Sequence, residues 1–502
     1  MEELKVKSIS RWVHDNIALV GLDNPRRSAY MTLRELIENS LDSCELGGYY
    51  PTIKVSIDQS NGEYIFQIND NGVGMKPDDV PTAFGVVLSS TKYVVRQSRG
   101  ILGIGGKGVV QLAYTTTQKP IVIATALPFS PTYRIYKLAI DIENNRPVIL
   151  QQVDKSNNGG WHGMIIKLQT KADFVEAMKD IKRYLSLTSM VCPYAEIKLE
   201  FNGSLEIDLP RTISELPPKP EVMSYHPYGL DVPILEELIR RNSFETVTDM
   251  LVSLQRVGKG TIKDFDKFCS QSASGLDLNK DPRSLSNGEM VRLVGLLHSF
   301  DGWYPPDMSG LSPVTESILT KGVGHLLSPD GVGYVSRKGV YGAHGFVLEI
   351  VIIYGGGVKV PRKEYGFEVF RFANKIPLLT EERNCLLSRV VEEQDFRRYA
   401  IEPFSPLAFV IHLASTKVPY KTAGKEYIAD NTDIRRELDL GVKEVLRQVK
   451  HILKAKARVA SELYRQSQFA LYLPIIARHV AYLTKSDEKQ VQSMLDAVVK
   501  RK

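Results

Sequence analysis

The chain has 502 residues, of which 43% are hydrophobic and 24% are charged, and this is the composition of a folded globular protein. These values exclude a disordered chain, a collagen and a coiled-coil rod. No apolar run approaches the roughly 18 residues that a membrane span requires, so no membrane segment is expected. A chain of this length predicts three or four domains.

Charge is distributed unevenly along the chain. The formal net charge is +6, but residues 441–502 carry 13 Lys and Arg against 5 Asp and Glu, a net of +8 that leaves −2 for the rest. Such an asymmetry is typical of a protein with a polyanionic partner, although a solvated helix face produces the same pattern more often. Both interpretations stay open at this point.

The four cysteines, at positions 44, 192, 269 and 385, lie far apart and form no Cys-x-x-Cys pair. This spacing argues against a disulfide framework or a structural zinc site. The start of the chain, Met1–Lys7, has no apolar stretch behind its charges and does not resemble a signal peptide. We therefore expect a protein of the reducing cytoplasm.

Helix and strand signals alternate in the first part of the chain. Asp23-Asn24-Pro25 predicts a helix start, apolar residues at helical spacing follow, and Gly47-Gly48 predicts its end. Five stretches have the composition of strands, and the first two are joined by a short turn. They cover 53–57, 64–68, 121–126, 133–142 and 164–168. The order predicts an α+β domain with a meandering sheet.

The proline-rich segment Leu216–Pro220 predicts a linker and a domain boundary. Helical patterns then dominate from Val232 to about Phe300, at Ile234–Arg241, Ser243–Leu254, Lys259–Ser270 and Ser286–Phe300. A second α+β unit follows, with strands at Phe346–Tyr354 and Phe409–Ala414. A long helix begins near Thr432, we expect Pro474 to interrupt it, and a last amphipathic helix covers Glu488 to Val499.

Three short motifs of the first domain have residue types that suit a nucleotide site. The first is Glu35 with Asn39, which lie four residues apart and so share one face of the predicted helix. The second is Asp70-Asn71-Gly72-Val73-Gly74, directly after a strand. Its glycines allow a flat ligand to approach the backbone, and its carboxylate can accept a hydrogen bond from an exocyclic amine. Taken alone, the first motif is more often an ordinary surface pair and the second a hairpin turn.

The third motif is the glycine-rich run Gly100 to Gly108, which leads into a helical pattern. Backbone N–H groups there can face a phosphate at the N-terminus of a helix, and Lys107 adds a positive charge. The run is neither a Walker loop nor a dinucleotide fingerprint. A single run of this kind is weak evidence, but the three motifs in this order within about 75 residues are specific.

Together these motifs resemble the nucleotide-binding fold shared by gyrase B, Hsp90, sensor histidine kinases and MutL, the GHKL superfamily. Further segments resemble one branch of it, the B subunits of archaeal topoisomerase VI. The resemblance covers most of the chain, from about Ile9 to the helix after Thr432. The segments are Asp23–Pro25, Glu35–Ser43, Phe84-Gly85, Ser89–Lys92, Arg96–Gly100, Leu209–Thr212 and His412–Pro419.

The resemblance implies roles for individual residues. Glu35 would be the general base that polarises the attacking water, and Asn39 would hold Mg²⁺. Asp70 would recognise the adenine of ATP, with Gly72 and Gly74 beside the base. A lysine of the second domain would contact the γ-phosphate; Lys425 matches best among Lys417, Lys421 and Lys425. The phosphate lid would comprise Thr91, Lys92, Gly100, Ile101, Leu102, Gly103, Ile104, Gly105, Gly106 and Lys107.

The resemblance also implies an organisation and partners. Residues 1–220 would form the ATP-binding domain with an N-terminal strap, 226–310 a helix-two-turns-helix domain, 311–470 a transducer ending in a stalk helix, and 471–502 a contact for an A subunit. Two copies would dimerise when ATP binds, in an A2B2 complex that passes double-stranded DNA. The alternative is another GHKL machine, a MutL-like repair factor or an Hsp90-like chaperone.

Overall fold

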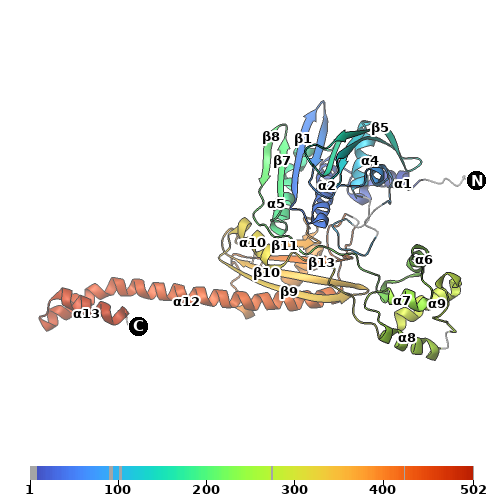
Figure 1. The fold of residues 1–502 in the computed structure, drawn as a ribbon. Helices are drawn as coiled ribbons and strands as arrows, with labels where there is room; N and C mark the ends of the chain where they lie inside the picture. The colour runs from blue at the N-terminus through green and yellow to red at the C-terminus, as the bar shows by residue number, and fades with distance from the viewer. Residues whose placement is uncertain (1–7, 90–93, 101–104, 273–274, 423, 501–502) are drawn as a thin grey trace, which may run out of the picture.

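The computed structural model describes residues 8–500 apart from 90–93, 101–104, 273–274 and 423 (Figure 1). The described chain forms an α+β domain, a small helical domain, a second α+β domain and a long projecting helix. Within the described residues, no helix combines the length and the apolar content that crossing a membrane requires. The α+β class predicted from the sequence is confirmed.

The first domain is built on one mixed sheet whose strands lie in the order β5-β4-β3-β6-β2-β1-β7-β8. Most neighbours are antiparallel, but β1 and β7 are parallel, so the sheet is not a simple meander. Helices α2 (Pro25–Gly47), α4 (Gly105–Thr117) and α5 (Phe174–Val191) share its hydrophobic core. The strands are β1 Thr52–Ser60, β2 Glu63–Asn69, β3 Ile121–Ala126, β4 Thr132–Asp141, β5 Arg146–Ser156, β6 Gly163–Thr170, β7 Glu196–Phe201 and β8 Ser204–Leu209.

Helix α2 begins and ends where the sequence predicts. The Asn24 side chain accepts a hydrogen bond from the backbone N–H of Arg27, and Pro25 occupies the first turn, where its missing N–H costs nothing. Gly48 ends the helix in the left-handed conformation, with φ of 71°. Both ends are therefore fixed by local chemistry, and α2 carries Glu35 and Asn39 into the domain.

The helical domain lies to one side of the two α+β domains (Figure 1) and has a separate core that includes Phe265, Phe300 and Trp303. It contains α6 (Val232–Arg241), α7 (Val247–Val252), α8 (Lys259–Gln271) and α9 (Asn287–Ser299). The predicted helix over 243–254 is too long. Thr246 and Asp249 form a capping box, so α7 starts only at Val247.

The second α+β domain has a sheet in the order β12-β11-β13-β10-β9. Strand β13 is buried at every position, because helices or loops cover both faces of the central strands. The elements of this second domain are α10 Glu316–Leu327, β9 Gly331–Tyr341, β10 His344–Tyr354, β11 Glu368–Ala373, β12 Ile376–Pro377, α11 Leu386–Glu392 and β13 Leu407–Ser415.

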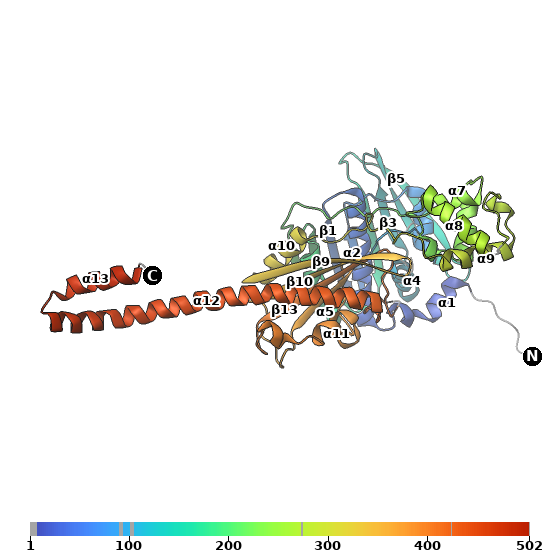
Figure 2. The same cartoon turned by 90° about the horizontal axis from the view of Figure 1, so that it is seen from below.

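Helix α12 (Thr432–Thr484) packs on β9 and β10 and then projects away from the body of the molecule (Figures 1 and 2). The expected interruption at Pro474 is wrong, because the helix continues through it. The loss is confined to the one backbone hydrogen bond that Pro474 cannot donate, and the exposed helix continues on both sides of it. The short helix α13 (Glu488–Lys500) folds back along the end of α12.

Candidate functional site

A cavity of about 620 Å³ lies under α2 in the first domain and is closed on one side by the second domain. Most of the residues singled out in the sequence line it, and they come from segments far apart in the chain. They are Glu35, Asn39, Asp70, Gly74, Gly100, Gly105, Gly106, Lys107 and Lys425. Of the expected lid, Thr91, Lys92, Ile101, Leu102, Gly103 and Ile104 lie outside the described residues.

Asp70 follows the end of β2 and forms one end of the cavity. Its carboxylate accepts hydrogen bonds from Ser40 Oγ at 2.9 Å, from the N–H of Gly72 at 2.9 Å and from the N–H of Met164 at 3.2 Å. Burial raises the pKa of Asp70, and these donors oppose the rise. The carboxylate is thus oriented before any ligand arrives, as specific recognition of an amine requires.

The glycines around Asp70 allow backbone to pack where a side chain has no room. A Cβ on Gly72 would lie 2.2 Å from Ser43 Oγ, and one on Gly74 would lie 2.2 Å from the carbonyl oxygen of Ala126. Gly74 also has φ of +65°, which favours glycine. Gly72 does not line the cavity itself; its backbone N–H donates to the Asp70 carboxylate.

The sequence alone assigned Gly163 no role beside Asp70. Gly163 has φ of +122°, and a Cβ there would lie 2.1 Å from the carbonyl oxygen of Asp70. It begins β6, whose next residue, Met164, both donates to the Asp70 side chain and accepts from the Asp70 backbone N–H. The signal was available as a glycine at the start of a predicted strand.

Glu35 and Asn39 share one face of α2, as their spacing predicts, and the first turn of α4 lies directly against it. A Cβ on Gly105 would lie 2.0 Å from Glu35 Oε2, and one on Gly106 would lie 3.2 Å from Asn39 Nδ2. Glycine at these positions therefore leaves the Glu35 carboxylate and the Asn39 amide in place; a larger residue at Gly105 would displace the end of the Glu35 side chain. The first N–H groups of a helix have no intrahelical partner, so this turn suits an anion beside Glu35 and Asn39.

Lys107 lies in the same first turn of α4 and is buried. Its ammonium donates to Ser89 Oγ at 2.7 Å. Burial lowers the pKa of Lys107 to about 8, so part of its charge is lost at mildly alkaline pH. A phosphate in the cavity would restore the charge by pairing with it.

Lys425 enters the cavity from the loop that precedes α12. Its Nζ lies 3.0 Å from Glu38 Oε2 and 3.5 Å from Glu35 Oε1. Burial alone would lower the pKa of Lys425, but the two carboxylates outweigh it and the pKa is raised. Lys417 and Lys421 are exposed, so among the three candidate lysines Lys425 is the one that reaches α2.

Arg34 and Glu38 complete this contact, and neither was assigned a role in it from the sequence. Arg34 Nε pairs with Glu38 Oε1 at 2.7 Å, and Arg34 Nη1 donates to the carbonyl oxygen of Gly424 at 3.1 Å. Burial would raise the pKa of Glu38, but Lys425 and Arg34 outweigh it and lower the pKa. The spacing of four residues between Arg34 and Glu38 on a helix was the available signal.

In the first domain, α2, α4 and α5 back a mixed sheet. Glycine turns surround a buried aspartate, and a helix that begins with glycines lies opposite a glutamate. This is the arrangement of a GHKL-type ATPase. The family model described as "Histidine kinase-, DNA gyrase B-, and HSP90-like ATPase" matches residues 24–115. A second family model, "Topoisomerase VI B subunit, transducer", matches residues 306–465.

Curated relatives extend the match over nearly the whole chain. The B subunit of type 2 DNA topoisomerase 6 from Pyrobaculum aerophilum is 33% identical, over 98% of this chain and 93% of that protein. The Metallosphaera sedula protein of the same name is 34% identical, over 97% of this chain and 92% of its own length. The chain belongs to the family of topoisomerase VI B subunits, and it is the ATP-hydrolysing subunit of a type IIB topoisomerase. The MutL-like and Hsp90-like alternatives are not favoured, because the transducer match is specific to this family.

Proposed function

We propose that this chain is an ATP-gated clamp. Two copies dimerise through their first domains when ATP binds, capture a DNA duplex and pass it through a break made by a separate A subunit. The observation that carries the proposal is the contact of Lys425, from the second domain, with Glu35 and Glu38 inside the cavity. A group of the second domain that reaches the nucleotide site can report which nucleotide is bound there.

In this proposal Glu35 is the general base that accepts a proton from the attacking water. Its carboxylate lines the cavity beside the first turn of α4, where the γ-phosphate would lie. The N–H groups of that turn, Lys107 and Lys425 would neutralise charge that develops on the phosphate oxygens. Asp70 would accept a hydrogen bond from the adenine amine at the opposite end of the cavity.

The residues beside Glu35 also suit Mg²⁺. Asn39 lines the cavity next to the glycine-started turn of α4 and can offer a side-chain oxygen, which is the kind of ligand a hard cation prefers. Mg²⁺ bound with ATP would draw its remaining ligands from phosphates and water, and it would neutralise phosphate charge. Asn39 would hold the ion, and Glu35 would stay free for the water.

Lys425 would change partners during the cycle. In the structure it pairs with Glu35 and Glu38; with ATP it would pair with the γ-phosphate, which leaves Glu35 available as a base. The loop around it is attached to α2 by Arg34 at Gly424 and by Arg27 at Glu426. A change at the phosphate would therefore reach the second domain and α12 through this loop.

The remaining domains are assigned in the same proposal. Residues 226–310 would be the helix-two-turns-helix domain, 311–470 the transducer and 471–502 the contact for the A subunit. The end of α12 supports the last assignment, because Tyr482 is 85% exposed and Leu483 is 79% exposed. Large apolar side chains left in solvent at the tip of a projecting helix are typical of an interface.

The test combines assembly with activity. The chain is mixed with a candidate A subunit, and relaxation of supercoiled DNA is measured with ATP, with a non-hydrolysable analogue and without nucleotide. Relaxation that requires both subunits and ATP supports the proposal. Sedimentation of the chain alone should show a monomer without nucleotide and a dimer with the analogue; equal masses would rule out the clamp.

A further inference from the structure

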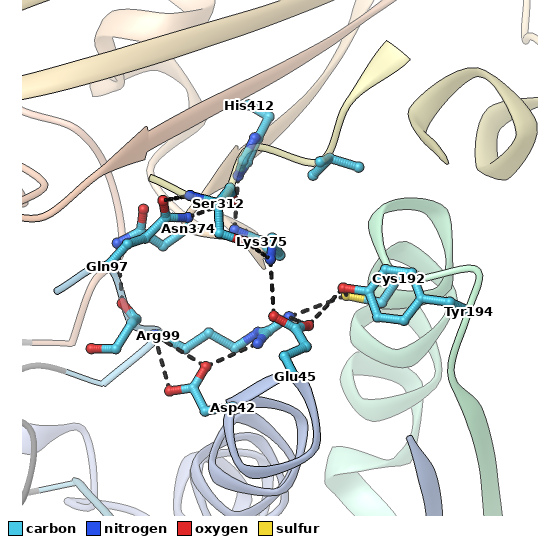
Figure 3. Close-up of polar contacts among 12 residues, drawn as sticks. Asp42, Glu45, Gln97, Arg99, Cys192, Tyr194, Ser312, Asn374, Lys375 and His412 are labelled. Atoms are coloured by element: carbon cyan, nitrogen blue, oxygen red, sulfur yellow. Dashed lines mark hydrogen bonds and ion pairs between the residues drawn. The ribbon is translucent and has the colours of Figure 1, made fainter. Parts of the chain in front are cut away.

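The second domain contacts α2 at both ends of the stretch that carries Asn39. Lys425 contacts it at Glu35 and Glu38. Lys375 contacts it at Glu45, as Figure 3 shows. A helix rises about 1.5 Å per residue, so Glu35 and Glu45 are about 15 Å apart along the axis. The Lys375 contact is therefore separate from the contact at the γ-phosphate end, and the proposed function gives it no role.

Lys375 lies in a two-residue turn between β11 and β12, in which Ala373 pairs with Ile376. Both turn residues have positive φ, 45° for Asn374 and 66° for Lys375. Such turns favour glycine at the second position, and a lysine there is strained. The turn is also buried, with Asn374 2% exposed and Lys375 3% exposed. A charged side chain at a strained, buried turn position indicates that its ammonium is needed.

The ammonium of Lys375 joins the two domains, with one contact in each. It donates to Glu45 Oε2 at 2.9 Å and to Ser312 Oγ at 2.7 Å. The backbone N–H of Lys375 donates to His412 Nε2 at 2.9 Å, so the ring proton of His412 lies on Nδ1, facing Glu349 at 2.8 Å. The turn is thereby fixed to β13, the strand that leads towards the Lys425 loop.

Glu45 connects this lysine to the start of the nucleotide lid. Its other oxygen accepts from Arg99 Nη2 at 2.6 Å and from Tyr194 Oη at 2.6 Å, and Arg99 also pairs with Asp42 at 2.9 Å. Burial alone would raise the pKa of Glu45, but Arg99 and Lys375 outweigh it and lower the pKa to about 2. Glu45 is thus ionised at any physiological pH.

The residues before Gly100 are bonded to the second domain as well. Asn374 Nδ2 donates to the carbonyl oxygen of Ser98 at 3.1 Å. The Gln97 side chain makes two hydrogen bonds with the backbone of Ser312, at 2.9 and 2.7 Å. The segment 97–99, directly ahead of the expected phosphate lid, therefore lies between α2 and the β11–β12 turn (Figure 3).

We propose that Lys375 is a positioning residue for ATP turnover: through Glu45 and Arg99 it connects the segment 97–99 and the far end of α2 to the second domain. This rests on the proposed function. When ATP binding changes the position of α2, these contacts make the second domain move with the helix, so that Lys425 reaches the γ-phosphate at the same time. Without the Lys375 contact, ATP still binds, but the two domains no longer move together.

The test uses the full chain with an A subunit and DNA, and compares Lys375→Met, which keeps the apolar stem, with Glu45→Gln and the double variant. We expect Lys375→Met to lower kcat at least about fivefold, the low end of typical coupling between sites, with KM and analogue binding within about twofold. If Lys375 acts through Glu45, the double variant should be no slower than the slower single variant.

Lys321→Met is the matched control. Lys321 also forms an ion pair between the domains, with Glu215 at 3.3 Å, but it is exposed. The kcat of this variant should equal that of the parent. An unchanged kcat in folded Lys375→Met, losses that multiply in the double variant, or an equal loss of analogue binding would overturn the inference. If Lys375→Met does not fold, the Glu45→Gln variant provides the test, and a kcat equal to that of the parent overturns the inference. A parent chain that never hydrolyses ATP overturns the proposed function itself.

Discussion

The ammonium of Lys425 lies 3.5 Å from the nearest carboxylate oxygen of Glu35, although the two residues belong to different domains. A carboxylate that is paired with a lysine is a poor base, because the positive charge favours its ionised form. While Lys425 pairs with Glu35, the proposed base is thus restrained. The γ-phosphate, a stronger partner for the lysine, would release it, which would link hydrolysis to the presence of a complete triphosphate.

This relationship gives the first prediction. Glu35→Gln should retain binding of an ATP analogue and lose turnover by about 10²–10⁴-fold, the usual contribution of a general base. Steady-state ATP hydrolysis and analogue titration measure the two effects. Glu38→Gln is the matched variant: it keeps the proposed base and should lose less turnover. Near-normal turnover in Glu35→Gln together with a large loss in Glu38→Gln would assign the base to Glu38 instead.

The second prediction concerns the adenine end of the cavity. Asp70→Asn should weaken ATP binding by roughly 1–3 kcal/mol, because the adenine amine and the Ser40 hydroxyl lose their shared acceptor. Ser40→Ala keeps the carboxylate and should weaken ATP binding less. Isothermal titration of ATP into both variants measures the two changes. If the parent binds GTP as tightly as ATP, Asp70 does not read the base, since guanine presents a carbonyl at that edge.

The third prediction is a pH dependence of nucleotide affinity. The pKa of Lys107 is lowered to about 8 by burial, and a bound phosphate would raise it again. Binding above pH 8 must therefore take up a proton, so affinity should fall as the pH rises, by about tenfold from pH 7 to 9. Fluorescent-analogue titrations at several pH values measure the slope. Lys107→Arg stays charged and should show a flat profile; equal slopes in both would exclude Lys107 as the titrating group.

The sequence predicted the local parts of this site well. Asn24 and Gly48 fix α2, and the glycines mark the turns by their conformations, so Glu35, Asn39 and Asp70 could be placed on the correct elements. These are effects within a few residues of each other. The same holds for β3, whose bounds match the expected 121–126.

Contacts between distant segments could not be predicted in the same way. Arg99 and Lys375 are separated by more than half the chain, and nothing around either residue indicates that both reach Glu45. Strand β5 is mostly exposed and shows little alternation, so its sequence carries no clear strand signal. A proline inside a helix ordinarily interrupts it, so the sequence does not predict that α12 continues through Pro474. Strand pairing and side-chain burial depend on tertiary structure.

The last prediction concerns the basic residues of the second domain. Arg397 and Arg398 lie in a short 3₁₀ turn beside α12, where Lys450 donates to the carbonyl oxygen of Arg398 at 3.1 Å, and Lys454 follows one turn later. We expect these cations to contact DNA phosphates. Reversing all four charges should weaken DNA binding at low salt and make the log–log salt slope shallower by about 0.9 per lost contact. Phosphate contacts carry no base information, so the loss should not depend on DNA sequence.

Charge reversal at four exposed lysines of the first domain provides the control for net charge; these are Lys54, Lys119, Lys171 and Lys179. That variant carries the same change in total charge, so a specific path through the second domain requires it to bind DNA more tightly than the first variant. ATP-analogue binding should be equal in both. If the two bind and relax DNA alike across a salt titration, the basic residues beside α12 form only a solvated face. Reversal at Lys259 and Lys263 would then test whether the DNA path follows α8 of the helical domain.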